Sequence, residues 1–304
     1  MAKLAAITGA TGFVGPHLVA ALARHGWTFR LLLRRWTPLP SLPGVEAEVV
    51  WGDLADEASL KRLVAGADAV VHAAGLIKAR QAIDFDRVNR DGTARLSALA
   101  PDIPFLLLSS LAAREPQLSP YAASKRAAEE VVVRRSGPWL AIRAPAVYGP
   151  GDRETLPYFK MAARGFALQP DQPNARLSLI HVEDLAEALA LALDRPLLPG
   201  VYEIDDGHPG GYRHADMAAA AAETLGRPVR ALRVGRGPMN AVARLNSLRP
   251  GPQILSLAKV RELYHSDWTV HERRLAEATG FVARFGLAEG FRHTILWYRA
   301  HHWL

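Results

Sequence analysis

The first half of the chain alternates short apolar runs with segments whose apolar residues recur at helical spacing. Short runs rich in valine, isoleucine and leucine predict strands buried on both faces, and the segments between them predict amphipathic helices. The predicted strands are Leu4–Thr8, Phe29–Leu33, Glu46–Trp51, Ala69–His72, Pro104–Ser109 and Trp139–Arg143. The predicted helices are Val14–His25, Glu57–Ala65, Asp84–Ala100 and Tyr121–Arg135. This alternation predicts an α/β fold, with a parallel sheet covered by helices on both faces.

After Gly149 the pattern is less regular and is interrupted by prolines. A strand, a helix and another strand are predicted at Arg176–Ile180, Val182–Asp194 and Gly200–Ile204. From Arg213 onward the pattern is mostly helical. We therefore expect a Rossmann-type doubly wound parallel sheet in residues 1–150, with 176–204 returning to it, and a smaller, mostly helical C-terminal part formed by 151–175 and 205–304.

The composition is typical of a globular protein, with 49% hydrophobic and 22% charged residues. The chain contains no cysteine, which excludes disulfides, thiolate metal sites and a cysteine nucleophile. The first residues lack the apolar core of a signal peptide, and no run approaches the roughly 18 apolar residues of a membrane span. We therefore expect a cytoplasmic protein.

A glycine-rich loop directly follows the first predicted strand. It has the sequence Thr8-Gly9-Ala10-Thr11-Gly12-Phe13-Val14-Gly15 and opens the first predicted helix. A pyrophosphate needs backbone N–H donors at close range and the positive end of a helix dipole, and glycines allow that approach. The loop therefore predicts a dinucleotide site, with cofactor contacts from Gly9, Thr11, Gly12, Phe13, Val14 and Gly15.

The end of the second predicted strand indicates which dinucleotide is bound. Sites for NAD usually place an acidic residue there for the ribose 2′-hydroxyl, but the segment 29–36 contains no carboxylate. Arg34 and Arg35 stand there instead and can pair with a 2′-phosphate. The sequence therefore favours NADP(H) and leaves NAD(H) open.

Two further strand ends carry residues suited to the cofactor. Asp53-Leu54 follows the third predicted strand, where a carboxylate can accept a hydrogen bond from the adenine amino group. Ala73-Ala74-Gly75 follows the fourth, where small residues let the backbone approach the cofactor closely. We expect both segments to line the dinucleotide.

A tyrosine and a lysine stand four residues apart, at Tyr121 and Lys125, on a predicted helix and therefore on one face of it. A neighbouring ammonium favours phenolate, which makes a tyrosine usable as a proton donor or acceptor. Lys125 can also hold the nicotinamide ribose. Upstream, Ser109 and Ser110 end the fifth strand, on the side where parallel sheets bind ligands, and a serine there can polarise a reacting oxygen.

These motifs together resemble the short-chain dehydrogenase/reductase superfamily, in its extended or atypical branch, the NAD-dependent epimerase/dehydratase type. The segments that carry the resemblance span about 1–195 and are residues 8–15, Gly52-Asp53-Leu54, 72–75, Val88-Asn89, Gly92-Thr93, 109–110, 121–125, 143–152 and 177–186.

The resemblance implies a catalytic set of Ser110 (or its neighbour Ser109), Tyr121 and Lys125, with Ser109 and Lys125 also contacting the cofactor. It implies further that Pro145 and Val147 line the nicotinamide pocket, that Asn89 supports the active-site helix, and that the protein forms a homodimer. Two features depart from nucleotide-sugar epimerases: Tyr121 follows Ser110 by only 11 positions, and Leu111–Arg114 replaces the usual tyrosine-and-glycine turn.

Arginine dominates the net charge of +7, since the 37 basic residues are 31 Arg and 6 Lys. No groove-reading motif accompanies them, so we do not expect nucleic-acid binding. Between Glu223 and Glu262 there are basic residues but no acidic one. This interval is typical of an anionic-ligand pocket, of a peripheral membrane contact with apolar Met239, Val242 and Leu245 between arginines, or of a solvated face.

The motifs favour an NADP(H)-dependent oxidoreductase that interconverts an alcohol and a carbonyl of a small-molecule substrate. Tyr121 would exchange the proton, Ser110 would orient the oxygen, and the C-terminal part would bind the substrate. Two alternatives are a nucleotide-sugar epimerase or dehydratase with internally recycled NAD, and a non-catalytic dinucleotide-binding assembly or sensor protein. No metal site is predicted, since the adjacent His301 and His302 have no carboxylate near them in the sequence.

Overall fold

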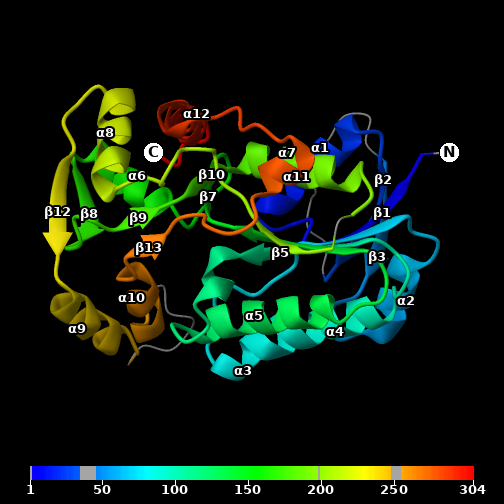
Figure 1. The fold of residues 1–304 in the computed structure, drawn as a ribbon. Helices are drawn as coiled ribbons and strands as arrows, with labels where there is room; N and C mark the ends of the chain where they lie inside the picture. Colours follow the sequence, from blue (N-terminus) through cyan, green and yellow to red (C-terminus); the bar gives the residue numbers. More distant parts are fainter. Residues whose placement is uncertain (1, 35–45, 198, 248–254) are drawn as a thin grey trace. The chain divides into compact units, whose positions relative to one another are not determined.

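A computed structural model describes residues 2–34, 46–197, 199–247 and 255–304 (Figure 1). The chain divides into two compact units. The first comprises Met1–Ala144, Leu185–Glu203 and Glu272–Phe281, and the second comprises Pro145–Asp184, Ile204–His271 and Val282–Leu304. Each unit is therefore built from separate stretches of the chain.

The first unit is built on a seven-stranded sheet in the order β11-β6-β5-β4-β1-β2-β3, and every neighbouring pair in it is parallel. Its strands are β1 (Leu4–Thr8), β2 (Thr28–Leu33), β3 (Ala47–Trp51), β4 (Ala69–His72), β5 (Phe105–Ser110), β6 (Trp139–Ala144) and β11 (Val201–Glu203). The order reverses at β1, next to β4, which is the place where doubly wound sheets bind ligands. The predicted α/β fold with a Rossmann-type parallel sheet is confirmed.

Helices cover both faces of this sheet (Figure 1). They are α1 (Val14–Arg24), α2 (Glu57–Val64), α3 (Ala82–Phe85), a π-helical turn (Asp86–Arg90), α4 (Asp91–Ala98), a 3-10 turn (Leu111–Arg114), α5 (Pro120–Val133), α7 (Val182–Leu193) and α11 (Leu275–Thr279). Apolar residues of α2, α4 and α5 pack with the central strands in one core. All four residues of β4 are buried, because both faces of the sheet are covered.

Local sequence signals fix where these helices begin. The Asp56 side chain accepts backbone N–H bonds at the start of α2. At the start of α5, Ser119 accepts the N–H of Ala122, and Pro120 occupies the first turn. Both are preferred N-terminal arrangements, because they satisfy or remove donors that the helix itself cannot bond.

The second unit contains short strand pairs and helices. Its strands are β7 (Ala146–Tyr148), β8 (Phe166–Pro170), β9 (Arg176–Leu177), β10 (Leu179–His181), β12 (Arg230–Val234) and β13 (Asp267–Trp268), and they pair as β7–β10, β8–β12 and β9–β13. Its helices are α6 (Leu156–Ala163), α8 (His214–Leu225), α9 (Arg236–Ser247), α10 (Leu257–Leu263) and α12 (Leu287–Ala300). Tyr148, Phe159, Phe291 and Tyr298 form its aromatic core.

Within the described ranges, no helix is both long and apolar enough to cross a membrane.

Candidate active site

The glycine loop lies between β1 and α1, at the carboxyl edge of the sheet. Gly9 has a φ of +82°, and a Cβ there would lie 2.5 Å from the backbone nitrogen of Ala74. A Cβ on Gly15 would lie 2.3 Å from the carbonyl oxygen of Gly9. Only glycine fits either position, because the surrounding atoms are backbone and cannot move aside.

The first turn of α1 adds donors to this loop. Its N-cap residue, Phe13, provides no side-chain hydrogen bond, and the first turn contains no acidic residue. The Phe13 side chain therefore does not cap this end of the helix, and Thr11 and Gly12 are exposed. A tight backbone cradle that faces a helix N-terminus fits the diphosphate of a dinucleotide.

A buried hydrogen-bond chain fixes the opposite wall of the loop. The Thr8 hydroxyl accepts the N–H of Ala74 at 3.2 Å and donates to Nδ1 of His72 at 2.7 Å. His72 Nε2 then lies 3.0 Å from the Thr93 hydroxyl, which donates to the carbonyl of Asn89 at 2.5 Å. The chain assigns the imidazole proton to Nε2, because Thr93 has already used its own proton.

Burial lowers the pKa of His72 to about 3, and the positive charge of Lys125 acts in the same direction. The imidazole is therefore neutral, in keeping with this bonding pattern. The chain holds the backbone after β4 in place, where Ala73 and Ala74 are half-buried and Gly75 is exposed. The sequence pattern predicts a role only for the small residues here.

The residues predicted to select the cofactor were assigned to the ends of the second and third strands. Arg34 directly follows β2 and is exposed, whereas Arg35 lies outside the described residues. Asp53 follows β3, is exposed, and accepts the N–H of Ala55 at 2.7 Å. Leu54 is half-buried and packs against Gly92. A Cβ on Gly92 would lie 2.9 Å from the Leu54 side chain. The basic and acidic side chains are both accessible to a ligand.

Tyr121 and Lys125 lie one turn apart on α5, and Tyr121 is half-buried with its ring against Phe85. The Lys125 ammonium is buried and donates to the carbonyl of Leu108 on β5 at 2.7 Å. A Cβ placed on Gly75 would lie 3.8 Å from its Nζ atom. Burial lowers the pKa of Lys125 to about 8, although the carboxylate of Glu129 acts in the opposite direction.

Asn89 connects the loop after β4 with α5. Its side chain accepts the N–H of Leu76 at 2.7 Å and donates to the carbonyl of the same residue at 3.0 Å. It also donates to the Ser124 hydroxyl at 2.9 Å, and Ser124 donates to the carbonyl of Tyr121 at 2.8 Å. The contacts agree with the support of the active-site helix that the resemblance implies for Asn89.

The two serines that end β5 have different surroundings. Ser110 is half-buried, and its oxygen accepts the N–H of Ala112 at 3.2 Å. Ser109 is buried and donates to Glu129 of α5 at 2.6 Å. Because neighbouring strand residues point to opposite faces, only one of the two can face a given ligand. The Ser109 hydroxyl already donates its proton to Glu129.

A largely buried ion cluster is centred on Arg143, and the sequence pattern does not reveal it. Arg143, only 3% exposed, pairs with Glu129 at 2.9 Å, with Glu272 at 3.0 Å and with Glu203 at 3.5 Å. The available signal was the spacing of Lys125 and Glu129, which are four residues apart. That spacing is also typical of exposed helix pairs, so it does not reveal burial.

Pro145 and Val147 belong to the second unit, where both are half-buried and Val147 lies on β7 beside Ile180 of β10.

The same unit contains a group of possible metal ligands, His181, Glu183 and His293. His181 Nδ1 lies 3.3 Å from the N–H of Glu183, which assigns the proton to Nε2, and Nε2 lies 3.2 Å from His293 Nδ1. Arg284 pairs with the Glu183 carboxylate. The protonated nitrogen and the engaged carboxylate fit a hydrogen-bonded pair better than a divalent cation.

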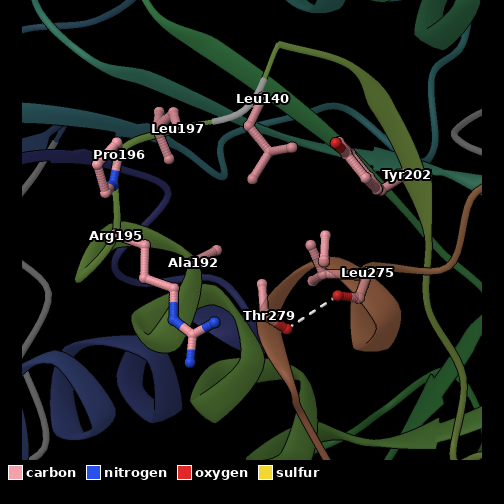
Figure 2. A pocket seen from close by; sticks show the side chains of 9 residues that line it. Leu140, Ala192, Arg195, Pro196, Leu197, Tyr202, Leu275 and Thr279 are labelled. Carbon is pink, nitrogen blue, oxygen red and sulfur yellow. Dashed lines mark hydrogen bonds between the residues drawn. The ribbon is translucent and has the colours of Figure 1, made fainter.

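Figure 2 shows a pocket of the first unit that is too small to bind a cofactor. It is lined by Leu140, Ala192, Arg195, Pro196, Leu197, Tyr202, Leu275, Ala278 and Thr279. Its volume is about 50 Å³, well below the roughly 300 Å³ at which ligand sites begin. The Thr279 hydroxyl, drawn with its bond to the carbonyl of Leu275, is also satisfied internally.

The parallel sheet and the glycine cradle define a dinucleotide-binding protein of the Rossmann class. The chain belongs to the NAD dependent epimerase/dehydratase family, whose model matches residues 5–204. This confirms the family that the sequence motifs predicted. The chain is accordingly an NAD(P)-dependent oxidoreductase.

Reductases are among the curated relatives of this chain. The chain is 46% identical over 305 residues to the ceramide reductase of Caulobacter vibrioides (strain NA1000 / CB15N), covering 98% of this chain and 95% of that protein. It is 29% identical over 227 residues to the 4-hydroxy-2-methyl-3-oxo-4-farnesyl-3,4-dihydroquinoline-1-oxide ketoreductase of Stigmatella aurantiaca, covering 67% and 68%.

Among solved structures, the UDP-glucose 4-epimerase of Thermus thermophilus in complex with NAD has the same fold. It superimposes with a TM-score of 0.73 at 21% identity, covering 98% of this chain and 99% of that one.

Proposed function

We propose that this oxidoreductase reduces the ketone of a ceramide-like lipid to a secondary alcohol, with NADPH as the hydride donor. The observation that carries the proposal is the 46% identity to a ceramide reductase, which extends over nearly the whole of both chains. A ceramide has a secondary alcohol next to its amide-bearing carbon, and the matching substrate is the corresponding 3-oxo amide. In this proposal the lipid is bound by the region that the sequence predicts to bind the substrate, 151–175 and 205–304.

The side chains of the first unit supply the groups that this reduction needs. The nicotinamide, when bound, supplies the hydride. The Ser110 oxygen accepts a backbone N–H, and its hydroxyl proton is the donor that we assign to the substrate carbonyl. Tyr121 donates a proton to the oxygen as negative charge develops on it. The buried ammonium of Lys125, held by the carbonyl of Leu108, stabilises the tyrosinate that remains.

A cofactor titration tests the preference for NADP(H). Purified protein is titrated with NADPH and with NADH while the cofactor fluorescence is followed, alongside the Arg34→Ala/Arg35→Ala double variant. We expect tighter binding of NADPH and a loss of that preference in the double variant, because two guanidinium groups no longer face the 2′-phosphate. Preference for NADH, or NAD retained through purification, contradicts the assignment and favours an epimerase or dehydratase with internally recycled NAD.

Product analysis tests the substrate. An N-acyl 3-oxo long-chain base in detergent is incubated with NADPH, and the secondary alcohol is measured by mass spectrometry. A ketone of a nucleotide sugar and a short water-soluble ketone serve as comparison substrates. We expect the lipid to be reduced with the highest kcat/KM. Equal or faster reduction of the nucleotide sugar refutes the lipid assignment, and no reduction of any ketone refutes the reductase.

A further inference from the structure

A buried carboxylate, that of Glu129, lies on α5 beside the groups to which the proposed reduction assigns a role. Glu129 follows Lys125 by four residues, and Lys125 follows Tyr121 by four. Residues at this spacing are neighbours on one side of a helix. Glu129 therefore extends the row along α5 that Tyr121 and Lys125 begin.

Both oxygens of this carboxylate accept hydrogen bonds from buried donors of the sheet. Oε1 accepts from the Ser109 hydroxyl at 2.6 Å and from Nε of Arg143 at 3.0 Å. Oε2 accepts from Nη2 of Arg143 at 2.9 Å. Two bonds from one guanidinium fix the orientation of a carboxylate as well as its distance. Glu129 therefore joins α5 to the ends of β5 and β6.

The negative charge of Glu129 also acts on Lys125. Burial lowers the pKa of Lys125 to about 8, and the Glu129 carboxylate opposes that effect. Arg143 carries one positive charge and shares it among Glu129, Glu203 and Glu272, so it does not fully neutralise Glu129. A negative charge therefore remains where it favours the ammonium form of Lys125.

The other charged groups on the elements around α5 do not replace this carboxylate. His72 of β4 is neutral, and Asn89 of the π-helical turn carries no charge. Arg114 of the 3-10 turn pairs with the buried Glu203. The charged residues of α3, the π-helical turn, the start of α4 and the outer side of α5 are exposed or partly exposed and pair as Asp84–Arg87, Asp86–Arg90, Arg90–Asp91 and Arg126–Glu130. Glu129 is therefore the buried carboxylate whose charge acts on Lys125.

We propose that Glu129 is a positioning residue of the reduction, which anchors the Ser109 hydroxyl and keeps the buried Lys125 side chain in its ammonium form. The proposal deepens the proposed function and rests on it, because that ammonium is the group assigned to stabilise the tyrosinate of Tyr121. Glu129 acts through Lys125 and Ser109 rather than on the substrate itself.

Nuclear magnetic resonance measures the ionisation of Lys125 directly. The chain contains only 6 lysines, so full-length protein with ¹³C-labelled lysine gives few Cε signals, and the Lys125 signal is assigned by its loss in Lys125→Arg. The signal is followed through a pH titration of the wild type, Glu129→Gln and Glu129→Asp. The matched control is Glu130→Gln, which makes the same change at the next residue of α5, an exposed carboxylate that pairs with Arg126.

We expect the pKa of Lys125 to fall by about one unit in Glu129→Gln, because an opposite charge nearby is removed. Glu129→Asp keeps the charge and should titrate close to the wild type, as should Glu130→Gln. Damage to α5 would instead admit water to Lys125 and raise its pKa toward the ordinary value of 10.5, so a fall is not a sign of misfolding. An unchanged or raised pKa in Glu129→Gln, or an equal fall in Glu130→Gln, overturns the proposal.

The anchoring role is tested by Glu129→Asp, which does not remove the buried charge. Its side chain is one methylene shorter, so it cannot reach Ser109 and Arg143 in the same geometry. The kcat for a short water-soluble ketone should fall about 10–100-fold, because small misplacements of reacting groups are costly, while the Kd of NADPH stays unchanged. A kcat equal to that of Glu130→Gln contradicts the anchoring.

The titration of Lys125 needs no turnover, which separates this proposal from the proposed function. A fall of the Lys125 pKa in Glu129→Gln, with no ketone reduced by the wild type, retains the charge effect of Glu129 and refutes the reductase. Reduction of ketones by the wild type, with the same Lys125 pKa in Glu129→Gln, retains the reductase and refutes the role of Glu129.

Discussion

Acid should destabilise the first unit through His72, because the folded protein holds that imidazole neutral between Thr8 and Thr93. Its pKa is lowered from 6.5 to about 3, mainly by complete burial. The unfolded chain therefore binds a proton first as the pH falls, and unfolding becomes more favourable. This contribution to stability is fully present above about pH 6.5 and declines steadily toward pH 3.

The magnitude follows from the difference between the two pKa values. Each pH unit between them corresponds to about 1.4 kcal/mol. Between about pH 7 and pH 5 the free energy of unfolding should fall by about 2 kcal/mol on account of His72 alone. The pKa values of His214 and His25 are shifted as well. Burial lowers the pKa of His214, which adds to the effect. At His25, burial is outweighed by hydrogen bonds to Asp194 and Glu187, so its pKa is raised and it acts in the opposite direction.

A matched variant isolates the contribution of His72 to the pH dependence of stability. Urea unfolding is followed by circular dichroism at both pH values for the wild type and for His72→Gln, which keeps a donor toward Thr93 but does not titrate. His25 and His214 are common to both proteins and cancel in the comparison. The wild type should lose about 2 kcal/mol more than the variant on acidification. An equal loss in both proteins would show that His72 is not held neutral and would refute the reasoning.

Three further predictions concern the candidate site. Tyr121→Phe should lower turnover of the ketone about 10²–10⁴-fold while the Kd of NADPH stays unchanged, because only the proton donor is removed; a parallel loss of cofactor binding would assign Tyr121 a structural role. Gly9→Ala should abolish cofactor binding and should lower the Tm further than the control Gly26→Ala. Both glycines have a positive φ, but only a Cβ on Gly9 would meet backbone, at 2.5 Å. Equal Tm values for the two variants would contradict the argument from close approach. Glu129→Gln should destabilise the protein by about 3–5 kcal/mol in urea unfolding, because it leaves a buried guanidinium with one partner fewer, and a loss below about 1 kcal/mol would show that the cluster is well hydrated.

The regular part of the fold could be predicted from the sequence because burial on both faces leaves a strong pattern. The strands β1 and β4 begin and end at the predicted residues, and the ends of the other strands of the sheet differ from the prediction by at most one residue. The second unit was harder. β12 lies in the stretch that the sequence predicts to be mostly helical. This strand was not predicted because Arg230–Val234 is exposed along nearly its whole length and has no alternation of apolar and polar residues. Its pairing with β8 depends on tertiary structure rather than on local propensity.

The candidate site was likewise only partly predictable from the sequence. The glycine loop was predictable, because its residue types and spacing follow from the space that a diphosphate requires. The bonding chain through His72 was not, since it joins residues 64 positions apart at Thr8 and 21 positions apart at Thr93. A sequence pattern indicates that a segment is buried but does not reveal which distant hydroxyl meets a buried imidazole.

The positions of Ser109 and Ser110 follow from how α5 is attached. Ser119 caps its first turn, Lys125 reaches the carbonyl of Leu108, and Glu129 accepts from Ser109. The last two bonds join one helix to one strand end at two points a single turn apart, which prevents α5 from sliding along or rotating against β5. Because Ser109 is bound to the helix, the pleat of the strand directs Ser110 to the other face. The serine that we propose to polarise the substrate and the helix that carries the proposed proton donor are thereby fixed to each other by buried bonds. Proton transfer at a single oxygen requires such positioning on rigid elements.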